Sequence, residues 1–185
     1  GPEVLEILEL PVPVPKEGQV LIQVEAVGVN RADILLREGR YGSHRELPVI
    51  PGFEVAGSVK AVGAGVKKFK VGQEVFALLE IGGYAEEVVV SEKLVLPVPK
   101  NLSVTEAAGI PDVFLTAWIT LFQKANLREG EKVLIHAAGS GIGMAAIQLA
   151  KVYGATVITT ASSDEKLEKA ESIGADFIIN YTKAD

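Results

Sequence analysis

The sequence predicts an α/β fold in which a β-rich first part is followed by the first half of a doubly wound parallel sheet. Two observations carry this prediction. Up to about Pro99, short runs bearing Val and Ile are punctuated by Gly and Pro, which is typical of β structure. From Glu131 onward, strand and helix patterns alternate, which is typical of a parallel sheet with right-handed crossovers. We therefore predict two domains, residues 1–105 and 106–185.

The first part contains strand-like runs separated by turns. Several of these runs are apolar on both sides, so we expect a closed or well-covered sheet and not an exposed one. A short helical patch follows the first run and ends at Gly39. The predicted strands are Val20–Val29, Glu54–Val62, Glu74–Leu79 and Tyr84–Val90, and the predicted helix is Ala32–Arg37.

The second part begins with helical spacing of apolar residues over Val104–Asn126, where Pro111 predicts a break between two helices. Strands and helices then alternate to the end of the chain. The predicted strands are Lys132–Ala137, Thr156–Ala161 and Asp176–Asn180, and the predicted helices are Ile142–Tyr153 and Asp164–Ile173.

Composition narrows the class of protein. The chain has 185 residues, 48% of them hydrophobic, and a formal net charge of −6. An acidic balance without a basic stripe argues against nucleic-acid binding. No apolar run approaches the ~20 residues that a membrane-spanning helix needs. The absence of cysteine rules out thiolate catalysis and a Cys-based zinc site, and it fits a cytoplasmic protein.

A glycine-rich turn joins the first strand and the first helix of the second part: Gly139-Ser140-Gly141-Ile142-Gly143. Glycines at such a turn let a pyrophosphate approach the N-terminus of the helix. The G-x-G-x-G spacing departs from the usual G-x-G-x-x-G, and a tight turn without a ligand is the alternative. Because the turn lies between an apolar strand and an amphipathic helix, we predict that these five residues bind a dinucleotide.

The end of the next predicted strand indicates which dinucleotide. NAD-binding sheets place an acid there for the ribose 2′-hydroxyl. Here the strand ends at Ala161 and is followed by Ser162 and Ser163, with Lys166 nearby. Hydroxyls and a cation, without the acid, favour the 2′-phosphate of NADPH. The alternative is that Ser163 only caps the next helix and Lys166 is solvated.

Four further segments, together with the glycine turn, resemble the medium-chain dehydrogenase/reductases. They are Gly28–Asp33, Pro51–Gly57, Gly82–Glu86 and Leu115–Trp118. The most similar branch is the zinc-independent quinone oxidoreductases, which includes zeta-crystallin and the tumour-suppressor-inducible quinone reductase. The resemblance implies a GroES-like catalytic domain followed by a Rossmann NADPH-binding domain, here only its first half.

The resemblance also bears on metal. Zinc-dependent members of the family bind the catalytic ion through a Cys in the first motif and a His beside the Glu of the second. This chain has Asn30 and Phe53 at those places, so we expect no metal. Alcohol oxidation needs a Lewis acid, whereas an electron-poor quinone or enone accepts a hydride with only hydrogen-bond support. We therefore expect reduction of a quinone or a similarly activated acceptor.

The same resemblance suggests roles for single residues. Tyr41 is the first candidate donor to the substrate oxygen, and Asn30 is the second; a wet loop tyrosine and a helix cap are the alternatives. Thr116 is expected to contact the nicotinamide, unless it bonds back to its own helix. Tyr181 is expected to approach the adenosine phosphate, unless it only covers the sheet edge. His136 is expected to be a satisfied core residue.

Three readings of the function stay open: an NADPH-dependent quinone reductase, an enoyl-thioester or enone reductase, and an inactive nucleotide-binding or interaction fragment. The chain stops after the third Rossmann strand, whereas the family usually runs past 300 residues. It is therefore expected to be a piece of a longer molecule or a truncated form with an open sheet edge. If the full family arrangement applies, we expect a homodimer.

Overall fold

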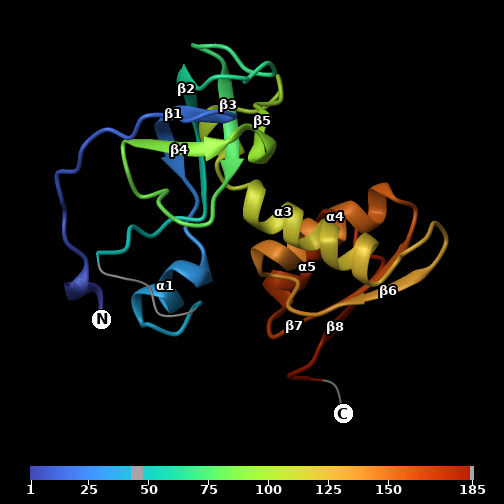
Figure 1. Cartoon of the computed structure of the whole chain (residues 1–185). Helices are drawn as coiled ribbons and strands as arrows, with labels where there is room; N and C mark the ends of the chain where they lie inside the picture. Colours follow the sequence, from blue (N-terminus) through green and yellow to red (C-terminus); the bar gives the residue numbers. More distant parts are fainter. Residues whose placement is uncertain (43–47, 184–185) are drawn as a thin grey trace. The chain divides into compact units, whose positions relative to one another are not determined.

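The computed structural model describes residues 1–42 and 48–183, and the chain forms two compact units (Figure 1). Unit 1 comprises Gly1–Asp112 and unit 2 comprises Val113–Asp185. Within the described ranges, no helix is both long enough and apolar enough to span a membrane.

Unit 1 is built on a five-stranded antiparallel sheet with the strand order β4-β1-β2-β3-β5. The alternation of apolar residues in β1 and β2 directs one set of side chains into the core, where Val20, Ile22 and Val55 are fully buried. β1 pairs along nearly its whole length with β2 and also with β4. The strands are β1 (Gln19–Val27), β2 (Glu54–Val62), β3 (Glu74–Leu78), β4 (Glu87–Ser91) and β5 (Val95–Pro97).

Two short helices of unit 1 begin with a capping box. α1 starts after Asn30 and α2 starts after Ser103, and each has an acid at its third position that bonds back to the backbone of the capping residue. Ala107 and Ala108 pack against Ala56 and Phe76 of the sheet. The helical segments are η1 (Pro2–Val4), α1 (Arg31–Arg37), η2 (Glu92–Leu94) and α2 (Val104–Ala107).

Unit 2 contains a three-stranded parallel sheet with the order β6-β7-β8. Small residues along α4, among them Gly143 and Ala146, allow this helix to pack closely on β6 and β7, while α5 packs on β7 and β8 (Figure 1). The elements are α3 (Pro111–Trp118, which starts in unit 1), the π-helical η3 (Ile119–Lys124), β6 (Lys132–Ile135), α4 (Gly141–Val152), β7 (Thr156–Ala161), α5 (Asp164–Ser172) and β8 (Phe177–Asn180).

The α/β fold class predicted from the sequence is confirmed: a five-stranded antiparallel sheet is followed by a three-stranded parallel sheet. Three details differ. The strand expected from Tyr84 starts only at Glu87, because the backbone N–H of Tyr84 donates to the Pro51 carbonyl and not to a neighbouring strand. The short β5 was not predicted. His136 is exposed and not in the core, because β6 ends one residue before it.

Candidate functional site

In unit 1, the capping of α1 also anchors a neighbouring loop. Asp33 is buried, and its Oδ2 accepts a hydrogen bond from the backbone nitrogen of Asn30 at 2.8 Å. Its Oδ1 accepts a second bond from the backbone nitrogen of Gly52, also at 2.8 Å. One carboxylate therefore joins the first and second family-like segments, and Asp33 has a structural role at this site.

Glu54, the first residue of β2, is the second buried acid of unit 1 and is 2% exposed. Its Oε1 accepts a hydrogen bond from Asn30 Nδ2 at 2.8 Å, and its Oε2 accepts one from the backbone nitrogen of Asp112 at 2.8 Å. Burial raises the pKa of Glu54, and Asp112 and Asp33 raise it further, although both hydrogen bonds lower it. The carboxylate thus connects Asn30 to the first turn of α3.

The third family-like segment, Gly82–Glu86, is hydrogen-bonded to the start of the second, Pro51–Gly57, and to the residue before it. Backbone hydrogen bonds run from Gly82 to Ile50, from Gly83 to Gly52 and from Tyr84 to Pro51, at 2.9 to 3.0 Å. Gly52 has a φ of +101°, and a Cβ there would meet the Gly83 backbone at 2.6 Å, so only glycine fits. Burial and the neighbouring Asp33 raise the pKa of the Tyr84 phenol to about 12.

Tyr41 and Phe53 pack edge to face, with ring centroids 5.3 Å apart and an interplanar angle of 73°. Phe53 is buried, whereas Tyr41 is 44% exposed. Unit 1 therefore brings the two predicted catalytic residues, Asn30 and Tyr41, to the adjacent residues Glu54 and Phe53. His44, to which we assign no role, lies outside the described residues.

The glycine turn of unit 2 lies between β6 and α4. The Oγ of Ser140 accepts a hydrogen bond from the Gly143 nitrogen at 3.0 Å and so caps α4. Ala137 takes a φ of +57°, and its carbonyl stands so close to Gly143 that a side chain there has no room. The turn is anchored to β7, since the Ala138 nitrogen donates to the Thr160 carbonyl at 3.0 Å.

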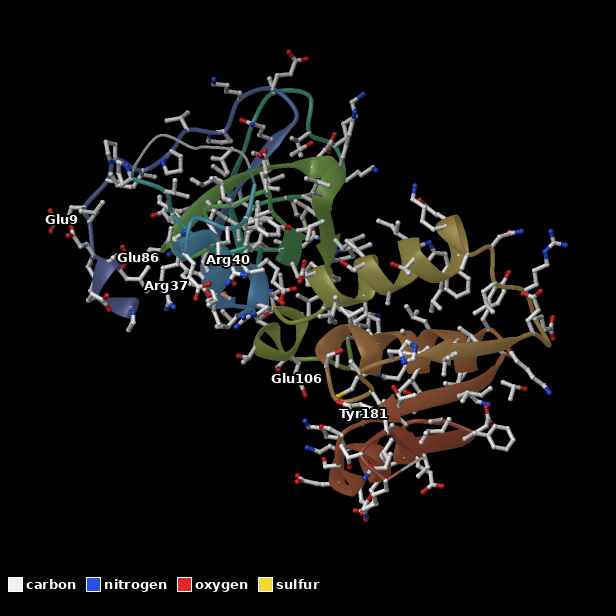
Figure 2. The ribbon with its side chains drawn as sticks, turned by 90° about the horizontal axis from the view of Figure 1, so that it is seen from below. Glu9, Arg37, Arg40, Glu86, Glu106 and Tyr181 are labelled. Carbon is white, nitrogen blue, oxygen red and sulfur yellow. The ribbon has the colours of Figure 1, made fainter. Side chains whose placement is uncertain are left out.

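The residues predicted to choose the cofactor gather at the carboxyl ends of β7 and β8. Ser163 is the residue before α5, and its hydroxyl makes no capping hydrogen bond. Lys166 Nζ lies 3.4 Å from Ser162 Oγ, and its stem lies against Gly139. Tyr181 follows β8, is 58% exposed, and donates its backbone N–H to the Ala161 carbonyl at 3.3 Å (Figure 2).

Unit 2 also holds Thr116, the predicted nicotinamide contact, and His136. Thr116 is half-buried on α3, and its carbonyl accepts a bond from the Thr120 hydroxyl at 2.7 Å. His136 Nδ1 lies 3.0 Å from Thr160 Oγ1. A cavity of about 220 Å³ adjoins the turn, and its lining includes Thr120, Leu134, His136, Ile142 and Gly143. Unit 2 thus combines a glycine turn, a helix N-terminus and hydroxyls with a nearby cation.

These features define a GroES-like unit followed by a nucleotide-binding type of parallel sheet. The family model "Alcohol dehydrogenase GroES-like domain" matches residues 16–100, and "Zinc-binding dehydrogenase" matches 141–185. The quinone oxidoreductase of Rattus norvegicus is 38% identical over the whole chain. The chain belongs to the medium-chain dehydrogenase/reductase superfamily. It spans only 57% of the length of that relative.

Solved structures give the same result. An NAD-dependent alcohol dehydrogenase matches the whole chain and 62% of its own length, with a TM-score of 0.91 and 42% identity. CurK enoyl reductase covers 94% of the chain and 54% of its own length, with a TM-score of 0.87 and 39% identity. The NADPH complex of Escherichia coli quinone oxidoreductase covers the whole chain and 57% of its own length, with a TM-score of 0.88 and 34% identity.

Zinc, which one family model carries in its description, does not fit the residues of unit 1. The two family ligand positions hold Asn30, an amide, and Phe53, an aromatic ring, and the Asn30 amide already bonds to Glu54. Within residues 1–42 and 48–183, no group of His, Cys, Asp and Glu is arranged to hold a metal ion. The sequence alone did not indicate that Glu54 and Tyr84 belong to the site. An acid inside the apolar run Phe53–Ala56 was the available signal for Glu54.

Proposed function

We propose that the chain carries the substrate-binding and NADPH-binding residues of a metal-independent reductase of quinones or similarly activated acceptors. Residues 1–105 serve as the substrate domain and residues 106–185 as the cofactor domain. The observation that supports this best is at the end of β7, where Ser162, Ser163 and Lys166 stand beside the glycine turn and no acid occupies Ala161.

The residues of unit 2 fit a dinucleotide. Gly139 and Gly143 leave the backbone open to a pyrophosphate at the start of α4, where unpaired helix N–H groups attract anions. Ser162, Ser163 and Lys166 would hold the 2′-phosphate, and Tyr181 would lie along the adenosine phosphate. Thr116 would bond the carboxamide of the nicotinamide. When bound, NADPH supplies the hydride that reduces the acceptor.

The residues of unit 1 supply hydrogen bonds to the acceptor. When a quinone takes up a hydride, negative charge develops on its carbonyl oxygen, and donors stabilise that oxyanion until a proton reaches it. Tyr41 can donate its phenolic O–H, and Asn30 can donate an amide N–H. Neither donation requires a Lewis acid, which agrees with the residues found in place of zinc ligands.

Fluorescence titration of the chain with NADPH and NADH, followed by addition of an ortho-quinone, tests this function. We expect tighter binding of NADPH and a loss of its fluorescence that depends on quinone. Binding without turnover would leave a nucleotide-binding fragment, and a preference for NADH would refute the role given to Ser163 and Lys166.

Reduction of an enoyl thioester or enone is the second candidate, supported by the similarity to CurK enoyl reductase. It requires the same hydride donor and the same stabilisation of an oxyanion, here that of the thioester or ketone oxygen. Comparison of an ortho-quinone with a crotonyl thioester, at equal NADPH, separates the two candidates through the ratio of their kcat/KM values.

A further inference from the structure

We propose that Glu54 is a positioning residue, whose carboxylate holds the Asn30 side chain so that one amide N–H is free to donate to the acceptor oxygen. This inference rests on the proposed function, because it names what fixes one of its donors. Glu54 itself is 2% exposed and therefore acts through Asn30.

The Asn30 amide is oriented by one hydrogen bond and by its place in the capping box of α1. Its Nδ2 donates to Glu54 Oε1 at 2.8 Å. Its oxygen faces the backbone nitrogen of Asp33 in the capping box of α1. An amide nitrogen carries two hydrogens, and Glu54 takes only one of them. Among residues 1–42 and 48–183 the second hydrogen has no hydrogen-bond partner, so Asn30 offers a donor and not an acceptor.

A carboxylate is needed for this arrangement because both atoms that face it are donors. Oε1 meets the Asn30 amide, and Oε2 meets the backbone N–H of Asp112. An ionised carboxylate accepts at both oxygens, whereas an amide in its place accepts at one and donates at the other. Asp33 and Asp112 are the charged groups that act on Glu54, and both disfavour its ionised form. Burial disfavours the ionised form more strongly than these charges do, and the two hydrogen bonds oppose it only in part.

The absence of a side chain at Gly28 leaves room for the Glu54 carboxylate. Gly28 lies against Glu54, and a Cβ at position 28 would overlap the Glu54 carboxyl group. The Gly28 nitrogen also donates to the Glu54 carbonyl at 3.3 Å. A glycine in the first family-like segment is therefore required for the Glu54 carboxylate to reach Asn30.

Glu54→Gln tests the proposal because it keeps the size of the side chain and removes one acceptor. The introduced oxygen still meets the Asp112 N–H, so the introduced NH2 faces the Asn30 NH2. Turning the Asn30 amide over relieves this clash and places its nitrogen beside the Asp33 backbone. We expect kcat for ortho-quinone reduction to fall at least about tenfold, as for loss of an oxyanion donor. We expect the Kd for NADPH to stay within about twofold, because its predicted contacts lie in unit 2.

The matched control is Glu106→Gln on α2. Glu106 also accepts a backbone hydrogen bond, from Ser103 at 2.8 Å, but it is exposed and is not bonded to Asn30 (Figure 2). We expect the kinetic constants of this variant to equal those of the wild type. Glu54→Asp keeps the charge, and we expect it to retain more kcat than Glu54→Gln.

NMR measures the amide orientation independently of turnover. In Glu54→Gln we expect a new nuclear Overhauser effect between the Asn30 NH2 protons and the Asp33 amide proton, which is weak or absent in the wild type. An unchanged amide, with or without a loss of kcat, overturns the proposal. If the wild-type chain reduces no quinone, the proposed function fails, and the NMR result still decides whether Glu54 orients Asn30.

Should Glu54→Gln fail to fold, the double variant N30D/E54Q replaces it. The introduced aspartate accepts from both the introduced glutamine NH2 and the Asp33 backbone N–H, so every hydrogen bond is restored. This variant should fold, and its kcat should stay at least about tenfold below that of the wild type because position 30 has no donor. Recovery of the wild-type kcat would mean that Glu54 and Asn30 serve folding only.

Discussion

The side chain of Lys166 lies against Gly139, and a Cβ on that glycine would stand 2.9 Å from both Cγ and Cδ of the lysine. The contact joins the glycine turn after β6 to the first turn of α5. In this position Lys166 is held beside the start of α4, where the proposed 2′-phosphate and pyrophosphate groups would both require positive charge or N–H donors. Gly139 therefore serves both the backbone turn and the placement of the cation.

We expect Gly139→Ala to weaken NADPH binding about tenfold with little change in stability. The Lys166 stem is flexible and can move aside, but it then leaves its place beside the turn. The matched change, Gly143→Ala, would press on the Ala137 carbonyl, which is backbone and cannot move alone. It should lower the free energy of unfolding by about 1–3 kcal/mol. Thermal denaturation measures the stability of each variant, and fluorescence titration measures its affinity for NADPH. Equal losses of stability in Gly139→Ala and Gly143→Ala would contradict this prediction.

Lys166→Ala should raise the Kd for NADPH by about tenfold to a hundredfold, because a charge-assisted hydrogen bond to the 2′-phosphate is lost. The Kd for NADH should change less than about twofold, since NADH lacks that phosphate. Lys169→Ala, further along α5, is the control and should alter neither value. An equal loss of affinity for NADPH and NADH in Lys166→Ala would show that this lysine does not bind the 2′-phosphate.

Elements with strong local patterns could be predicted from the sequence. β2 and β7 were predicted with their observed bounds, because alternating or continuous apolar runs flanked by glycine define strands locally. The three residues of β5 were not predicted because a short run that ends at Pro97 has too little pattern. Tyr84 was placed in a strand, but its backbone bonds to Pro51, a partner distant in sequence.

The candidate site divides in the same way. The glycine turn and Lys166 could be proposed from the sequence because they lie within one strand–helix–strand–helix segment. Glu54 could not, because its role depends on Asn30 and Asp112, which are 24 and 58 residues away along the chain. Long-range hydrogen bonds of this kind leave only an indirect trace, a charged residue within an apolar strand.

Acid should destabilise unit 2 through Asp176. Hydrogen bonds from Lys151, at 2.8 Å to each carboxylate oxygen, and from the Val157 backbone lower the pKa of Asp176 in the folded chain. The folded state then binds its proton less readily than the unfolded state. The stabilisation is present above the unfolded pKa of ~3.9 and is lost as pH falls through the lower folded pKa.

Asp176→Asn should therefore lower the free energy of unfolding at pH 7 by about 1 kcal/mol, a figure reduced for partial exposure. It should also flatten the acid limb of the stability curve measured by urea unfolding from about pH 5 down to about pH 2. Glu168→Gln, at an exposed position of α5, is the control and should leave stability unchanged. An acid limb of unchanged slope in Asp176→Asn would contradict the assignment.

Alkali should affect unit 1 through Tyr84, whose pKa is raised to about 12 by burial and then by Asp33. The folded state keeps the phenolic proton that the unfolded state releases near pH 10. The contribution of Tyr84 to stability is thus complete below about pH 10 and is lost as pH rises toward 12. Ultraviolet absorbance of phenolate should show a late component, and Tyr84→Phe should remove it while the rest of the curve stays. If Tyr84→Phe removes a component centred near pH 10 instead, burial and Asp33 do not raise the pKa of the Tyr84 phenol.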